Sequence, residues 1–310
     1  MDIARVDRRD FLAAAAAAPF ALRGALPTVL VTADAEAHVV AVDLLSGLVR
    51  KRIPTRPGPR SIERVGESAV VAHTAVGEVS IVRGLEVRRV LDRFVEPRYT
   101  VSARDGRHAF VTDSGSAELV TVDVVRGAVV ARLKLRLWPR HLSLSGDRRL
   151  LWLGLGTSSP ELDVVDVTDP TRPRLHGRVQ PPFPAHDVGF SPSGRVWVTA
   201  GEARSLAVYD GTEVRTFAAD AAPQHVTFLG RHAFVTSGDD GTLRVYDEPS
   251  ARLLRTTRIP VGSYNVQHAA GRVLTPSLAA GTLCVLDASG RLRTRRTVAR
   301  SSHDACLAGR

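Results

Sequence analysis

A short apolar motif recurs seven times along this chain at a spacing of about 40 residues. Each copy follows a Gly-Arg-like turn, and the intervals between copies are 41, 39, 42, 45, 37 and 40 residues. The copies begin at Val29, Val70, Ala109, Leu151, Val196, Ala233 and Val273. A period of this length, built from strand-like runs, is typical of radial β architectures. The sequence therefore predicts an all-β fold, a seven-bladed β-propeller.

Each unit contains four apolar runs bounded by Gly, Pro, Asp and Ser, which predicts four antiparallel strands per blade. The clearest unit spans 185–218, and no stretch after residue 27 favours a helix. The third run of most units ends in an aspartate, which we expect to accept hydrogen bonds from turn amides. These residues are Asp43, Asp123, Asp166, Asp210, Asp247 and Asp287.

The two ends of the repeat region predict how the ring closes. The first run, from Thr28, reads as a second strand with no first strand before it, whereas 302–309 reads as a first strand with none after it. Pairing the two would remove the open sheet edges. We expect one propeller domain over 28–310, a monomer, in which the C-terminal innermost strand joins the N-terminal strands.

Residues 1–27 are interpreted separately, as a twin-arginine-like signal segment. Arg8, Arg9, Phe11 and Leu12 precede the alanine-rich run 13–22, and Arg23 follows it. The apolar run is shorter than the roughly 20 residues of a membrane span. It predicts export, to the periplasm or beyond the cell, with membrane contact only through this segment if it stays uncleaved. The alternative is an alanine-rich helix without a targeting role.

The formal charge of +10 comes almost wholly from arginine, because Lys51 and Lys134 are the only lysines. The arginines spread over the predicted outermost strands, where charge resists edge-to-edge aggregation. No nucleic-acid motif is present, so we expect no specific nucleic-acid partner; non-specific attraction to polyanions stays open. Cys284 and Cys306 have neither metal-site nor redox spacing, and we expect them unbridged.

Stacking the units places one polar column at the start of the innermost strands. Two arginines, Arg98 and Arg140, directly precede members of this column, as does Arg60. Innermost strands begin at one mouth of the central channel, so the column predicts a ring of side chains there. Its members are Ser61, Tyr99, His141, His186, His225, Asn265 and His303.

Three interpretations of this ring are open. Four imidazoles, of His141, His186, His225 and His303, could bind a divalent transition metal. Alternatively His186 or His303, each followed by an aspartate, could act as a general base. Tyr99, Asn265, Arg98 and Arg140 would complete a ligand-binding mouth with an anion-binding side. The third interpretation is structural: the ring residues bond the backbone of the next blade and need no ligand.

The repeats resemble those of the YVTN-type (YncE-like) seven-bladed β-propellers. The likeness covers 28–310 and is clearest in FSPSGRVWVTAG (190–201), RHAFVTDSGSAELVTVDVVRG (107–127) and RHAFVTSGDDGTLRVYD (231–247). The chain departs from the pattern where Ala, Asp or Ser replaces the Asn that often ends the second strand, and VLTPS (273–277) matches poorly. The resemblance implies the fold, export and a binding role; propellers of lactonase or lyase activity share the architecture.

Three functions are therefore carried forward. The first is a non-enzymatic binding or scaffold module for a protein, a cell-envelope component or a small molecule. The second is a lactonase-like hydrolase or lyase that uses a channel-mouth histidine. The third is a metal-binding propeller with a histidine ring. No nucleophile elbow, P-loop or zinc-protease motif is present, which does not exclude an enzyme, because propeller enzymes assemble their sites from residues dispersed over many blades. We favour the first, non-enzymatic interpretation.

Overall fold

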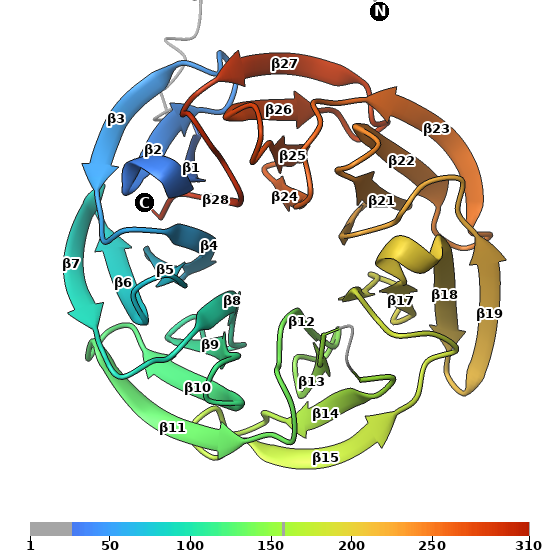
Figure 1. The fold of residues 1–310 in the computed structure, drawn as a ribbon, viewed down its shortest axis with the longest axis horizontal. Helices are drawn as coiled ribbons and strands as arrows, with labels where there is room; N and C mark the ends of the chain where they lie inside the picture. The colour runs from blue at the N-terminus through green and yellow to red at the C-terminus, as the bar shows by residue number, and fades with distance from the viewer. Residues whose placement is uncertain (1–26, 157–158, 310) are drawn as a thin grey trace, which may run out of the picture.

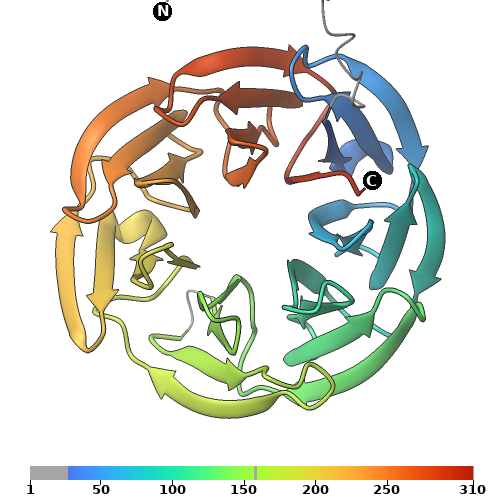
Figure 2. The ribbon, with the colours of Figure 1, turned by 180° about the vertical axis from the view of Figure 1, so that it is seen from behind.

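The computed structural model describes residues 27–156 and 159–309 of the chain. They form 28 strands in seven four-stranded antiparallel sheets, arranged as blades around a central axis (Figure 1). Figure 2 shows the same ring of blades from behind. The seven-bladed propeller predicted from the repeat is confirmed.

The blades are numbered in chain order, with each blade's strands given from the axis outward. Blades 1 to 4 are β28 (Ala305–Leu307), β1 (Thr28–Ala33), β2 (His38–Asp43), β3 (Val49–Pro54); β4 (Pro59–Val65), β5 (Ser68–His73), β6 (Glu78–Arg83), β7 (Glu86–Leu91); β8 (Pro97–Ser102), β9 (His108–Asp113), β10 (Glu118–Asp123), β11 (Ala128–Lys134); and β12 (Leu142–Leu144), β13 (Leu150–Gly154), β14 (Leu162–Asp166), β15 (Arg174–Val179). Blades 5 to 7 are β16 (Asp187–Phe190), β17 (Val196–Thr199), β18 (Ser205–Asp210), β19 (Glu213–Ala218); β20 (Val226–Leu229), β21 (His232–Ser237), β22 (Thr242–Asp247), β23 (Arg252–Arg258); and β24 (Gln267–Ala269), β25 (Arg272–Pro276), β26 (Thr282–Leu286), β27 (Leu292–Thr297).

Blade 1 combines the two ends of the repeat region. Strand β28 pairs with β1 in antiparallel register, with Val29 opposite Leu307 and Val31 opposite Ala305. The Thr32 N–H also donates to the Asp304 carbonyl at 2.9 Å. The predicted closure of the ring by the C-terminal innermost strand is therefore confirmed.

The core lies between the blades, because alternate residues of a strand face opposite neighbours. On β5, Val70 packs in a cluster with residues of blade 3, whereas Val71 packs in a cluster with residues of blade 1. Both faces of the middle strands are thus buried, and all six residues of β5 are buried. The outermost strands are mostly exposed, as in β27, and carry the arginines that sequence placed there.

The turns follow the predicted chemistry with two exceptions. Five of the six aspartates at the ends of third strands accept hydrogen bonds from turn amides, as Asp43 does from Leu45 and Ser46. Asp210 instead pairs with the Arg195 guanidinium at 2.9 Å. The expectation of no helix was incomplete, since 3-10 turns occur at η1 (Asp34–Glu36) and η2 (Gly201–Ala203).

The predicted signal segment, apart from Pro27, lies outside the described residues. Within the described ranges no helix is long and apolar enough to cross a membrane. Both cysteines are buried and free, as expected.

Candidate metal centre at the channel mouth

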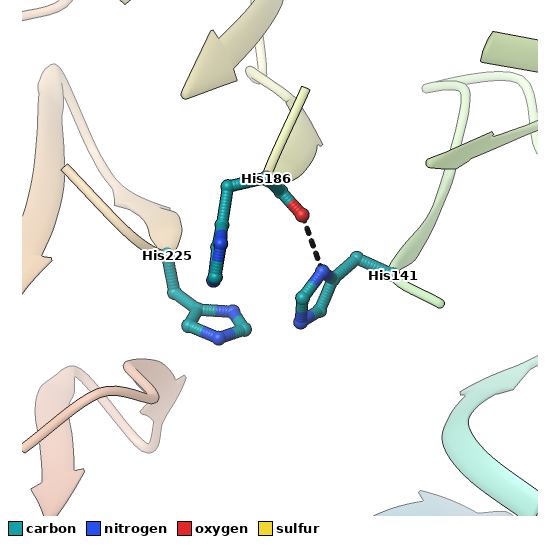
Figure 3. A group of neighbouring side chains, drawn as sticks. All are labelled: His141, His186 and His225. Carbon is teal, nitrogen blue, oxygen red and sulfur yellow. Dashed lines mark hydrogen bonds between the residues drawn. The ribbon is translucent and has the colours of Figure 1, made fainter. Parts of the chain in front are cut away.

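Three histidines of the predicted ring meet at the axis. His141, His186 and His225 stand directly before β12, β16 and β20, the innermost strands of three consecutive blades. Their imidazoles project toward one another (Figure 3), with ring centroids 4.4 to 5.4 Å apart. One ligand nitrogen of each lies within 4.8 Å of the others. We call these three residues the histidine triad.

His141 presents an uncommitted nitrogen to the centre of the triad. Its Nδ1–H donates to the backbone carbonyl of His186, in the next blade. Its Nε2 is buried and has no hydrogen-bond partner among the described residues. Burial holds the pKa of His141 well below its usual range, assisted by the positive fields of His225, His186 and Arg140. The side chain is therefore a neutral imidazole whose free lone pair is on Nε2.

His225 is oriented by a carboxylate from the preceding blade. Its Nδ1 lies 3.3 Å from Oδ2 of Asp187, and the same oxygen accepts the Val226 N–H at 3.1 Å. A proton on Nδ1 satisfies this contact and leaves the Nε2 lone pair for another partner. Metal-binding histidines commonly have such a carboxylate behind them. The aspartate next to His186 in sequence thus serves a histidine of the following blade.

His186 is the more accessible member of the triad. The backbone of η2 passes beside it, and a Cβ on Gly201, where φ is +57°, would lie only 3.3 Å from His186 Nδ1. Glycine therefore leaves room for the imidazole as well as adopting the left-handed conformation. Burial, then the charges of His225 and Arg140, hold the pKa of His186 well below its usual range.

Threonines at the last or next-to-last position of three second strands bond the backbone beside the ring. Thr112 Oγ1 donates to the Arg140 carbonyl at 2.8 Å, and Thr199 Oγ1 donates to the Gln224 carbonyl at 2.7 Å, each in the next blade. Thr236 bonds the Tyr264 carbonyl in the same way. Each acceptor directly precedes a ring member. The Val-Thr pair that recurs in the repeats marked the position of these threonines. Their hydrogen bonds to the next blade were not predicted.

The other ring members surround the triad without joining it. Tyr99 stacks on His141 with centroids 4.0 Å apart, and burial raises its pKa. His303 Nδ1 lies 2.8 Å from the Arg60 carbonyl and 3.2 Å from Asn265 Nδ2. Ser61 Oγ bonds Thr100 at 3.1 Å. His303, predicted as a fourth metal ligand and as a general base, makes with Nδ1 the same kind of contact to the next blade as His141 does, but within the described ranges it does not belong to the group whose ligand atoms converge.

The three arginines before ring members differ in their partners. Arg98 bonds the Glu96 carboxylate and lies 4.3 Å over the Trp138 ring. Arg60 pairs with Asp34 at 3.7 Å. Arg140 lies 5.3 Å from the Trp138 centroid; its Nε is buried and unpartnered, and no carboxylate of the described ranges is within ion-pair distance. Only Arg140 keeps an uncompensated charge at the mouth.

Below the ring, the innermost strands line a polar channel cavity of about 420 Å³. Glu63, Arg148, His268 and Asp304 are among its lining residues. Burial first, and then the charge of Asp304, raises the pKa of Glu63 to about 8, and burial raises that of Asp304 to about 6. Glu63 was not predicted; its place two residues after Ser61 on β4, hence on the same strand face, was the available signal.

No protein-family model and no curated protein matches the sequence. Solved structures share its fold at low identity. A functionally unknown protein from Desulfotomaculum acetoxidans has a TM-score of 0.74 and 9% identity, over 90% of this chain and 98% of that one. Apo AztD from Citrobacter koseri has 0.69 and 13%, over 91% and 98%. A putative 6-phosphogluconolactonase from Bacteroides fragilis has 0.71 and 11%, over 91% and 97%.

These likenesses establish the propeller fold and nothing finer, because unrelated functions share this architecture. The YVTN-type resemblance of the repeats stays a prediction.

Proposed function

We propose that the protein is an exported, non-enzymatic binding module that holds one divalent transition metal ion with His141, His186 and His225. The observation that carries the proposal is the convergence of three imidazoles whose ligand nitrogens lie within 4.8 Å of one another. His141 Nδ1 bonds a backbone carbonyl of the next blade, and His225 Nδ1 lies beside a carboxylate of the preceding blade. Neither contact involves the Nε2 atom of the ring.

The chemistry of the donor set favours zinc, copper or nickel. Neutral imidazole is the ligand that these ions share, and burial keeps His141 and His186 neutral. A buried nitrogen without a hydrogen-bond partner costs free energy, which a bound cation at His141 Nε2 would recover. Three protein ligands leave a coordination position open for a further ligand.

Zinc stoichiometry tests this proposal. Protein stripped with a chelator and dialysed against zinc is expected to retain one ion per chain. A variant with His141, His186 and His225 all replaced by alanine should retain none, because its ligands are gone. His176→Ala is the matched control, since His176 is exposed on β15, the outermost strand of blade 4. Equal zinc content in the wild type and the triple variant contradicts the proposal.

Export is proposed from the sequence of 1–27 alone, on the paired Arg8 and Arg9 and the mild apolar run behind them. Fractionation of cells that express the whole chain tests it: replacement of both arginines by lysine should retain the protein in the cytoplasm, and unchanged export would contradict it.

A further inference from the structure

We propose that the metal ion held by the histidine triad binds a small oxyanion, a carboxylate or a phosphate, jointly with Arg140. The inference rests on the metal-binding function proposed above and names the ligand class of that site. Its starting point is charge. Three neutral imidazoles leave the two positive charges of a divalent ion uncompensated, and Arg140 adds a third at the same mouth.

The carboxylates around the triad are already committed to other groups. Asp187 Oδ2 lies 3.3 Å from His225 Nδ1 and accepts the Val226 N–H. Asp304 accepts the N–H groups of Ile62 at 3.0 Å and Ala305 at 2.9 Å. Asp34 pairs with Arg60. None of them belongs to the group of residues whose ligand atoms converge with the triad in the described ranges. Within 27–156 and 159–309, no carboxylate is therefore placed to bind the ion directly, and we assign that role to an external anion.

Arg140 is held in place but not satisfied. Its backbone N–H donates to the Gly154 carbonyl at 2.8 Å, and its carbonyl accepts from Thr112 at 2.8 Å. Its guanidinium rests near the face of Trp138, a favourable position for a cation. Its buried Nε still lacks an acceptor within the described part of the chain. Arg98, the corresponding residue one blade earlier, has both its Nε and its Nη2 on Glu96.

Arg140 starts from the same rim of the channel as the triad. It directly precedes His141 in the chain, and its backbone is fixed beside the end of β13 by the hydrogen bond to Gly154. A cation beside a metal ion is unfavourable unless an anion lies between them. An oxyanion resolves this arrangement, because one oxygen can take the open metal position while another accepts from the planar guanidinium. Carboxylate and phosphate share this geometry.

Cobalt-loaded protein provides the test, because the visible absorption of Co²⁺ reports its ligands. The wild-type Co²⁺ complex is titrated with acetate and, separately, with phosphate. A saturable spectral change with either anion is expected, and the anion that gives it identifies the source of the oxyanion. Arg140→Gln should weaken that anion at least about tenfold, through loss of a charged hydrogen bond. Arg98→Gln, already paired in the wild type, should leave anion affinity within about twofold.

Affinity for the ion itself separates the two proposals. Arg140→Gln is expected to bind Co²⁺ as tightly as the wild type or more tightly, because a like charge has been removed. Arg140→Lys keeps the positive charge but loses the planar guanidinium and its paired N–H donors. It serves as a second variant in case Arg140→Gln does not fold. Its affinity for the anion should fall between those of Arg140→Gln and the wild type. Absence of a spectral change with both anions, or equal anion affinity in all variants, overturns the inference. Failure to bind Co²⁺ at all overturns the proposed function instead.

Discussion

Asp187 and Asp304 occupy the same position in two blades, yet only Asp187 contacts a histidine of the triad. Both accept a backbone N–H from the next blade, at Val226 and Ile62. Asp187→Asn is expected to weaken zinc binding about 10- to 100-fold, because an amide holds the His225 Nδ1 proton less strongly than a carboxylate does. Isothermal titration of chelator-treated protein with zinc measures the effect.

Asp304→Asn is the control for that variant. It perturbs an equivalent inter-blade contact without touching His225, so its zinc affinity should match that of the wild type. Equal losses of zinc affinity in the two variants would show that ring geometry, rather than the carboxylate behind His225, governs binding.

The Glu63 carboxyl is expected to make the stability of the folded protein depend on pH. Its pKa is about 8 in the folded protein, raised first by burial and then by Asp304, against an ordinary value of 4.5. The folded state therefore keeps a proton that the unfolded chain loses, so this residue lowers stability as the pH rises from 4.5 to 8. Glutamine does not ionise. Glu63→Gln should gain stability over the wild type across this range, by at least about 1 kcal/mol at pH 8.5.

Urea unfolding of the wild type and Glu63→Gln at pH 5 and pH 8.5 measures that difference. A stability difference that is the same at both pH values would mean that the Glu63 carboxyl titrates normally in the folded protein.

At the scale of the strand, a threonine at the end region of the second strand links blades 3, 5 and 6 to the blade that follows each of them. Thr112 Oγ1 donates to the Arg140 carbonyl and accepts the Tyr99 N–H at 3.1 Å. Thr112→Val should cost about 1–2 kcal/mol in free energy of unfolding, because it leaves a buried carbonyl and a buried amide without this partner. Chemical denaturation measures it.

Thr275, next to last in β25 of blade 7, is the matched control. Its Oγ1 is buried without a hydrogen-bond partner in the described part of the chain. Thr275→Val removes an unsatisfied hydroxyl and keeps the shape, so stability should be unchanged or increased. Destabilisation of both variants by the same amount would attribute the effect to packing rather than to the hydrogen bond across blades.

Strands were the part of the structure that sequence predicted best. The recurring apolar motif and the turn residues around it placed the start of β17 at Val196, as observed, and that of β21 one residue late, because backbone hydrogen bonding and burial act locally. The repeat unit also placed His141, His186 and His225 at the same position of three successive blades. It did not distinguish them from His303, because a shared repeat position does not determine which way a side chain turns. The pairing of Asp187 with His225 crosses blades and left no local signal.

At the scale of the whole molecule, the triad joins three neighbouring blades of a ring that closes elsewhere. Blades 4, 5 and 6 each contribute one imidazole, whereas closure depends on the short pairing of β28 with β1 in blade 1. An ion bound to all three histidines would link these blades across the axis and stabilise the folded ring by mass action. The metal ion would then stabilise the propeller fold as well as being the ligand that the protein binds.

Diffraction from zinc-soaked crystals at the zinc absorption edge tests the central claim most directly. The account predicts one anomalous peak on the propeller axis, about 2.0–2.1 Å from a ring nitrogen of each of His141, His186 and His225. An axis without a peak, or a zinc ion held by other residues while these three imidazoles keep only their contacts across blades, would contradict it.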